Sequence, residues 1–311
     1  MKIAVLAGGV GGARFVRALT EVVDPRAVTV IANVGDDLEV HGLHVSPDLD
    51  TLLYTLSGLG DDERGWGRAG ETWNASETIE LLGGETWFQL GDRDIGLHLV
   101  RTEALSRGEP LSAVTARLAR SVGLVVTLLP ATDDRLRTRM RTPAGELDFQ
   151  DWFVARGQRD RVNEVVYEGA EAARAAPGVL EALEEAELIA IAPSNPFVSI
   201  GPILAVRAIS EALERRRDRL VAVSPLIGGR AVKGPAGAMF ASLAGGTGPA
   251  QVTDCYKGLI GALVLDEADA DGVDAVAERG VRPLVTRTLM SEPDARRALV
   301  ETVLGLVPAT T

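Results

Sequence analysis

The sequence predicts an α/β fold, a mostly parallel sheet with helices on both faces. Short apolar runs of the kind that form buried strands recur along the 311 residues, and segments with helical spacing of apolar side chains separate them. The runs span residues 3–6, 28–32, 124–129, 188–192, 220–223 and 262–265. Each run is followed by small, polar, acidic or glycine-rich residues. Because the carboxyl ends of parallel strands share one edge of a sheet, we expect these segments to meet there and bind a ligand.

A glycine-rich loop joins the first predicted strand to a helix. Apolar residues recur at helical spacing from residue 13 to 22, and four glycines precede them, Gly8, Gly9, Gly11 and Gly12. Glycine lets the backbone approach a phosphate closely, and a helix N-terminus offers unpaired N–H groups. The pattern is typical of nucleotide-binding units, although Arg14 replaces the third glycine of the dinucleotide fingerprint and a P-loop is excluded. A tight turn with a surface arginine is the alternative.

Asn33, Asp36 and Asp37 follow the second predicted strand, where an acid binds a ribose in dinucleotide-binding folds. Two adjacent acids leave both a nucleotide contact and a tight turn open. A long insertion, about residues 38–120, then precedes the third strand, and a second irregular stretch spans about 135–176. Since no linker rich in proline, serine or glycine divides the chain, we expect one domain, residues 1–311. In that domain the two insertions would form a lid or subdomain over the sheet edge.

Two carboxylates open a predicted helix in the first insertion. Ser46 is suited to cap this helix, and Pro47 to be its first residue. Asp48 would complement the helix dipole, an explanation that fits Asp50 less well. Residues two apart on a helix point to different sides, so both carboxylates reach one ion only if the helix starts late or frays. Mg²⁺ takes one or two carboxylates plus substrate phosphates, which makes Asp48 and Asp50 candidate metal or substrate ligands.

A compact, charged run follows in the same insertion, Leu90, Gly91, Asp92, Arg93 and Asp94. We expect Arg93 to be held between the two acids, which would make it a fixed donor for an anionic or heterocyclic ligand. A surface ion-pair loop of little energetic value is the alternative.

The loops after the fourth and fifth predicted strands carry polar and cationic side chains. Hydroxyl and amide groups at a helix start, suited to a phosphate or a base, come from Ser194, Asn195 and Ser199. The next loop is rich in glycine and contains Ser224, Gly228, Arg230 and Lys233. Its two cations could supply the positive charge that a diphosphate needs.

Composition narrows the class of protein. A net charge of −12 argues against a nucleic-acid partner and does not favour an anionic membrane surface. The single cysteine, Cys255, excludes an internal disulfide and fits a reducing compartment. No apolar run reaches membrane-spanning length, so we expect a soluble cytoplasmic protein. The three histidines and Cys255 have no zinc-site spacing.

The same stretches resemble the CofD family from about residue 2 to the final helix. The motifs that carry the resemblance span residues 7–14, 33–37, 46–51, 64–67, 90–94, 129–134, 148–152, 192–196 and 224–228. Arg-Gly-Trp-Gly at residues 64–67 and Gly-Val-Gly-Gly-Ala-Arg at 9–14 look most like its FbiA branch. The resemblance implies a Rossmann-like core and a homodimer that needs Mg²⁺.

The activity implied by the resemblance is a 2-phospho-L-lactate transferase of coenzyme F-420 biosynthesis. Such enzymes move a phospho-three-carbon-acid unit, phosphoenolpyruvyl or 2-phospho-L-lactyl, from a guanosine diphosphate-activated donor. The acceptor is the ribityl hydroxyl of the deazaflavin Fo (7,8-didemethyl-8-hydroxy-5-deazariboflavin), and GMP is released. The FbiA branch implies the enolpyruvyl donor.

Site residues follow from the matched motifs as expectations. Asp48 and Asp50 would be catalytic, holding Mg²⁺ or orienting the acceptor hydroxyl. The residues expected to bind Fo are Asp50, Thr51, Leu90, Gly91, Asp92, Arg93, Pro130 and Asp133. Those expected to bind the nucleotide are Gly9, Gly11, Gly12, Asn33, Ser194, Asn195, Ser199, Ser224, Gly228 and Lys233.

Two other functions remain open. One is a sugar nucleotidyltransferase, because Leu-Ala-Gly-Gly-x-Gly also opens such enzymes, although Gly12-Ala13-Arg14 departs from their pattern. The other is a regulatory protein that binds nucleotide sugars without catalysis, as in a related branch of the superfamily.

Overall fold

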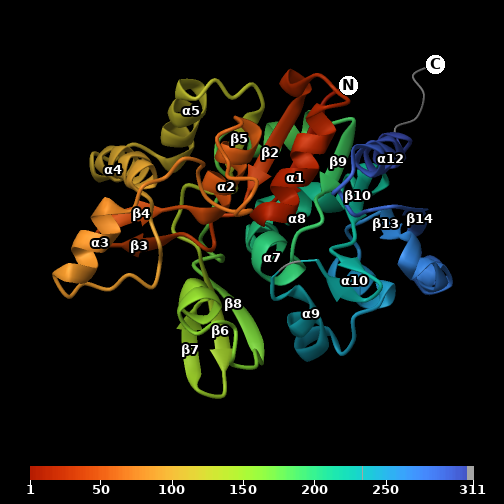
Figure 1. Cartoon of the computed structure of the whole chain (residues 1–311). Helices are drawn as coiled ribbons and strands as arrows, with labels where there is room; N and C mark the ends of the chain where they lie inside the picture. The colour runs from red at the N-terminus through yellow and green to blue at the C-terminus, as the bar shows by residue number, and fades with distance from the viewer. Residues whose placement is uncertain (233, 307–311) are drawn as a thin grey trace.

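A computed structural model describes residues 1–232 and 234–306 and confirms the α/β fold. Seven parallel strands form the central sheet in the order β14-β13-β10-β9-β1-β2-β5 (Figure 1). Their bounds are β1 Ile3–Ala7, β2 Val28–Ala32, β5 Thr127–Pro130, β9 Leu188–Ile191, β10 Leu220–Val223, β13 Ala262–Asp266 and β14 Arg282–Thr286.

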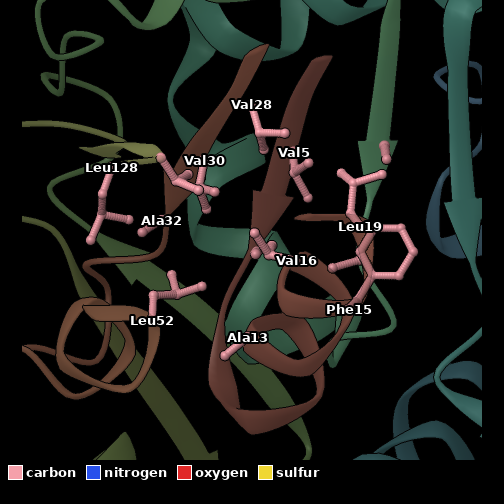
Figure 2. Close-up of a cluster of buried hydrophobic side chains, with 14 of the residues drawn as sticks. Val5, Ala13, Phe15, Val16, Leu19, Val28, Val30, Ala32, Leu52 and Leu128 are labelled. Carbon is pink, nitrogen blue, oxygen red and sulfur yellow. The ribbon is translucent and has the colours of Figure 1, made fainter. Parts of the chain in front are cut away.

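The central strands are buried on both faces because helices cover the sheet on both sides. Along β1, Val5 packs with one hydrophobic cluster, whereas Leu6 packs with the other. The first cluster includes Phe15 and Leu19, and Figure 2 shows these side chains packed near Val5. Helices on this face are α1 Gly9–Thr20, α2 Pro47–Leu56, α5 Leu111–Ser121 and α12 Pro293–Leu304. The opposite face packs against α6 Val179–Glu185, α7 Gly201–Ala205, α8 Arg207–Glu214, α10 Pro249–Cys255 and α11 Val273–Ala277.

Two strands of the central sheet differ from the prediction by more than one residue. The third strand was predicted from residue 124 but begins at Thr127, because Leu124 N–H bonds back to Ala119 O and completes the end of α5. The seventh strand, β14, was not predicted. It contains Pro283, which lacks an N–H, and lies at the sheet edge, where proline is tolerated.

The first insertion is mostly helical. It contains the hairpin β3 Leu38–Val40 and β4 Leu43–Val45, then α2, α3 Asn74–Leu81, α4 Asp92–Ser106 and α5. In Figure 1 the hairpin, α3 and α4 extend to one side of the central sheet.

The second insertion is a small antiparallel sheet rather than irregular structure. Strand β6 Arg137–Thr142 lies between β7 Gly145–Asp148 and β8 Glu164–Glu168, and Figure 1 shows this sheet below the central one. Backbone bonds fix it to the loops of the central sheet, since Thr138 N–H donates to Gly35 O at 2.7 Å. The hydroxyl of Tyr167 donates to Phe197 O at 2.6 Å. Whether the chain forms one domain stays a prediction.

The last third of the chain completes the edge. It contains the hairpin β11 Leu226–Ile227 and β12 Arg230–Ala231, followed by α9 Ala236–Met239. Within the described residues no single helix is long and apolar enough to cross a membrane. Among the residues that the structure describes, one bent pair of helical segments, Pro196–Ala205 and Arg207–Glu214 at 93°, has the length and apolar composition of a membrane span.

Candidate active site

The strand order reverses between β1 and β9, and this is where the loops converge. From β1 the chain goes to β2 and β5 on one side, and from β9 to β10, β13 and β14 on the other. Such a switch point leaves a crevice beyond the strand ends, the usual ligand site of open α/β sheets. Ser194, after β9, donates its hydroxyl to Gly8 O, after β1, at 2.8 Å. The predicted glycine loop and the predicted Ser194 loop are therefore in contact.

The glycines of the first loop are required by close packing. Helix α1 already begins at Gly9, so Gly11 and Gly12 lie in its first turn. A Cβ at Gly11 would lie 2.8 Å from Pro193 O, and one at Gly12 would lie 2.7 Å from the Ser194 hydroxyl. Side chains here would separate the two loops, so glycine keeps the N-terminus of α1 at the switch point.

Asp48 ties three segments together at this crevice. Its Oδ1 accepts the N–H of Gly9 at 2.8 Å, and its Oδ2 accepts the side-chain amide of Asn33 at 2.9 Å. The Asn33 amide also donates to Val198 O at 3.0 Å, and its carbonyl accepts Gly35 N–H at 2.7 Å. Asn33 and Asp48, predicted from separate motifs, are therefore direct partners.

Negative charge accumulates beside Asp48. Asp36 and Asp37 are both buried, and each has an Oδ1 that finds no hydrogen-bond partner in the described part of the chain. Burial, and then the nearby Asp48, hold the pKa of Asp36 well above its usual value. Burial also raises the pKa of Asp48 to about 6, against the opposing bonds from Asn33 and Gly9. The arrangement would be relieved by a cation or a hydrogen-bond donor.

Ser46 occupies the predicted cap position of α2, but its hydroxyl does not cap the helix. Instead it donates to Oδ2 of Asp37 at 2.9 Å, and the Nε2 of His44 lies 2.9 Å from the same oxygen. Ser46 therefore occupies the N-cap position as predicted, but its hydroxyl bonds to a buried carboxylate instead of to a backbone N–H of the helix.

Asp50 faces a different set of partners from Asp48. Its carboxylate forms a two-contact ion pair with Arg101 of α4, one contact being Nη1 to Oδ2 at 3.0 Å. The N–H of Ser46 also donates to Oδ2 at 3.3 Å, and His98 Nδ1 lies 3.8 Å away. Burial lowers the pKa of His98 to about 4, so the imidazole is neutral at pH 7. Among the described residues, no group of three or more His, Cys, Asp or Glu side chains is arranged to hold a metal.

The charged part of the run at residues 90–94 begins α4 at Asp92, and Gly91 is the N-cap of this helix. Asp92 accepts bonds from the segment before α3 and from the first turn of α3, including Thr72 Oγ1 at 2.6 Å and Ala75 N at 3.0 Å. Asp94 accepts the hydroxyl of Tyr54 at 2.5 Å. The expectation that Arg93 is held between these acids is wrong. Its side chain is exposed, and within the described residues its guanidinium contacts Ala69 O at 3.4 Å.

Two of the residues expected to bind Fo, Thr51 and Asp133, line separate hollows. Thr51 lines one with Val10, Arg14, Thr55 and Trp66. Asp133 lines the other, a cavity of about 190 Å³ that Val34, Asp37, His44 and Arg137 also surround. Asp133 accepts Ser112 N–H at 2.6 Å, at the start of α5. Pro130 is buried at the end of β5, and Leu90 packs with the β3–β4 hairpin.

Asp269, which was not identified from the sequence, holds the turn of the β11–β12 hairpin in the C-terminal half. Gly228 and Gly229 form the turn of the β11–β12 hairpin with positive φ angles of 56° and 69°. Their N–H groups donate to the carboxylate of Asp269 at 2.9 and 3.0 Å. Ser224 is buried, with its hydroxyl beside the backbone of Leu226. Lys233 lies outside the described residues.

Asn195 and Ser199 lie at the helical turn after β9. The side-chain Oδ1 of Asn195 accepts Phe197 N–H at 2.9 Å and caps this turn, and Ser199 is buried in it. Arg101 and His98 were not singled out from the sequence either. Their spacing of three places them on one side of α4, a signal that could have indicated a shared contact.

Comparison with known proteins identifies relatives over the whole chain. A family model described as 2-phospho-L-lactate transferase CofD matches residues 3–293. Curated proteins named phosphoenolpyruvate transferase are 43% identical in Streptomyces coelicolor and 41% identical in Thermobifida fusca. Both alignments cover 98% of each chain. The protein of that name from Mycolicibacterium smegmatis is 38% identical, also over 98% of each chain.

A solved structure shares the fold. A UPF0052-family protein from Bacillus halodurans superposes with a TM-score of 0.64, covering 97% of this chain and 98% of that one. At 16% sequence identity this likeness shows the fold alone.

Proposed function

The chain belongs to the CofD family of coenzyme F-420 biosynthesis and is a transferase, and on this premise we propose the reaction that it catalyses. The ribityl hydroxyl of Fo attacks the distal phosphorus of a guanosine diphosphate bearing enolpyruvate. A new O–P bond forms, the bond from that phosphorus to the bridging oxygen breaks, GMP leaves, and the proton of the hydroxyl passes to solvent. The names of relatives 38–43% identical over nearly the full chain support the enolpyruvyl unit.

The switch-point crevice is the proposed donor site. Phosphates fit the N-terminus of α1, where the glycines keep the backbone accessible beside Ser194. The guanine nucleotide extends along the loops that carry Asn195, Ser224 and Gly228. The contact between Ser194 and Gly8, which joins the two halves of the sheet at this point, is the single observation that carries the proposal.

One or two of the carboxylates beside this crevice, together with the phosphates of the donor, would hold Mg²⁺. Asp36 and Asp37 each have a buried oxygen without a partner in the described residues, and Asp48 lies next to them. Hard oxygen ligands of this kind suit Mg²⁺, which would neutralise charge on the donor's phosphates. Asp50 fits this role less well, because Arg101 already contacts both of its oxygens.

Asp50 and Thr51 are proposed to position the acceptor. Phosphoryl transfer depends mainly on placing the nucleophile in line and on stabilising charge. Asp50 would accept a hydrogen bond from the ribityl hydroxyl and so orient the hydroxyl oxygen toward the phosphorus. The guanidinium of Arg64 lies 4.9 Å from the ring centre of Trp66 and 5.1 Å from that of Trp73. These contacts would order residues 64–73, which would cover the site and exclude water from it. A homodimer and a cytoplasmic location stay predictions.

The test incubates the purified protein with Fo, Mg²⁺ and either the enolpyruvyl or the lactyl guanosine diphosphate donor. The expected product is a phosphodiester of Fo, with one GMP released per turnover and the enolpyruvyl donor used faster. Asp50→Asn should reduce transfer in a protein that still folds, with a lowered Tm because the buried guanidinium of Arg101 loses its charged partner. A folded wild-type protein that binds a nucleotide sugar but transfers nothing would favour the regulatory alternative. Pyrophosphate release from NTP and a sugar phosphate would favour a nucleotidyltransferase.

A further inference from the structure

Arg101 is the only arginine or lysine that is buried within the described residues, with 2% of its surface exposed. It projects from α4 onto α2, and its guanidinium meets both carboxylate oxygens of Asp50. Asp50 is itself 5% exposed. The remaining arginine ion pairs of the described chain all include a side chain that is at least partly exposed.

Stability alone is a weak reason for such a pair. Removing two charges from water costs free energy that their attraction only partly returns, and apolar replacements are often as stable. A two-contact guanidinium–carboxylate pair does, however, fix the plane and direction of the carboxylate. The structure adds a further constraint, since Nδ1 of His98 lies 3.3 Å from Nη1 of Arg101. A neutral imidazole accepts from the guanidinium at that nitrogen and holds it against Asp50.

From this geometry we infer that Arg101, held by His98, is a positioning residue that fixes the carboxylate of Asp50 for the acceptor hydroxyl. The inference rests on the proposed function, in which Asp50 contacts the acceptor. Arg101 acts through Asp50 and does not itself touch the reacting atoms. Nε of Arg101 is buried without a partner in the described residues, so the guanidinium makes its contacts through Nη1 and Nη2, to Asp50 and His98.

The test compares Arg101→Met and Arg101→Lys with Asp50→Asn and with the double variant Asp50→Asn/Arg101→Met. Arg101→Met should lower kcat about 100-fold or more while the donor KM changes less than about threefold, because only the acceptor-facing carboxylate loses its orientation. Arg101→Lys should retain part of kcat. In the Asp50→Asn background, Arg101→Met should cost less than about threefold further, since the group it positions has already been altered.

The double variant also keeps the test valid if Arg101→Met folds poorly. The single change leaves a buried carboxylate unpaired, whereas the double variant removes that charge and should recover several degrees of Tm. The matched control is Arg107→Met, which removes an exposed arginine paired with Glu103 at the end of the same helix and should leave turnover unchanged.

Three outcomes contradict specific parts of the proposal. Folded Arg101→Met with wild-type kcat overturns the positioning role while leaving the proposed function intact. Losses that multiply in the double variant show that Arg101 and Asp50 act independently, which also overturns it. Absence of transfer by the wild-type protein overturns the proposed function and the positioning role with it.

Discussion

Asn33 and Asp48 form a buried hydrogen bond of 2.9 Å that joins the loop after β2 to the first turn of α2. The Asn33 amide also holds Val198 O, so one side chain fixes three loops of the crevice. Asn33→Asp places two buried carboxylates in contact and should lower the free energy of unfolding by about 3–5 kcal/mol. Urea titration measures this. The same change at the exposed Asn163 should cost less than about 0.5 kcal/mol. Equal effects at the two positions would contradict the assigned role of Asn33.

Gly8 is the position in the first loop where a side chain has least room. Its backbone is extended, with φ of −153°, but a Cβ would overlap Oδ2 of Asp48 and crowd Ser199. Gly8→Ala should therefore destabilise the fold by about 1–3 kcal/mol and reduce turnover.

Gly96 provides the matched control for the change at Gly8. It lies within α4, and a Cβ added there would meet no atom within 4 Å outside the helix's own backbone. Gly96→Ala should stabilise the protein by about 0.5–1 kcal/mol through helix propensity. Thermal unfolding of both variants checks the pair, and a stable, active Gly8→Ala protein would show that the loop does not need glycine there.

The buried carboxyl group of Asp94 should make the free energy of unfolding depend on pH. Burial raises its pKa to about 6, against the opposing hydrogen bond from Tyr54. Because the folded state holds this proton more tightly than the unfolded state, whose Asp pKa is about 3.9, ionisation destabilises the fold as pH rises from about 4 to 6. Asp94→Asn retains an acceptor for Tyr54 without the charge. Its stability relative to wild type should therefore increase over that range, by up to about 3 kcal/mol.

Unfolding by urea at four pH values from about 4 to 7 measures this difference. Subtracting the wild-type curve cancels groups that both proteins share, such as Asp36. Parallel curves for the two proteins would show that Asp94 titrates alike in the folded and unfolded states.

Asp269 should control donor binding through the β11–β12 hairpin. Its carboxylate accepts the N–H groups of Gly228 and Gly229, so Asp269→Ala releases the turn that is proposed to hold the nucleotide. A hydrogen bond to a charged group contributes about 1.5–3 kcal/mol. If donor binding weakens by a free energy of this order, the KM for the donor should rise about tenfold or more. The KM for Fo should remain unchanged. Asp271→Ala, at an exposed acid two residues on, is the control. A rise in the KM values of both the donor and Fo would show that Asp269 does not act on donor binding alone.

The central sheet could be predicted because its strands are apolar and local in sequence. The strand at residues 28–32 and that at 220–223 have the predicted bounds. Strand β6 was missed because its residues Arg137, Arg139 and Arg141 alternate with buried Thr138, Met140 and Thr142, which leaves no continuous apolar run. Such half-exposed antiparallel strands depend on their partners, β7 and β8, for recognition.

The site was predictable where it follows the strand ends and not where it depends on packing between helices. Ser194 and the glycine loop meet because the sheet topology brings any two such loops together. The pairing of Asp50 with Arg101 joins residues 51 positions apart and is set by how α4 packs, which periodicity does not reveal. The prediction for Arg93 failed in the opposite way. The acids beside it in the sequence accept hydrogen bonds from residues elsewhere, Thr72 and Tyr54, and do not hold Arg93.

The position of β1 bears on how the chain is made. It leaves the ribosome before every other strand of this sheet, yet one of its two neighbours, β9, begins at Leu188. Until that point has been translated, this inner strand of the finished sheet has an open edge, and both long insertions emerge before that edge closes. Open apolar edges recruit other chains, so translation products that stop before Leu188 should be insoluble and depend on chaperones. Late pairing of the earliest strand makes synthesis, rather than the folded state, the stage most exposed to aggregation.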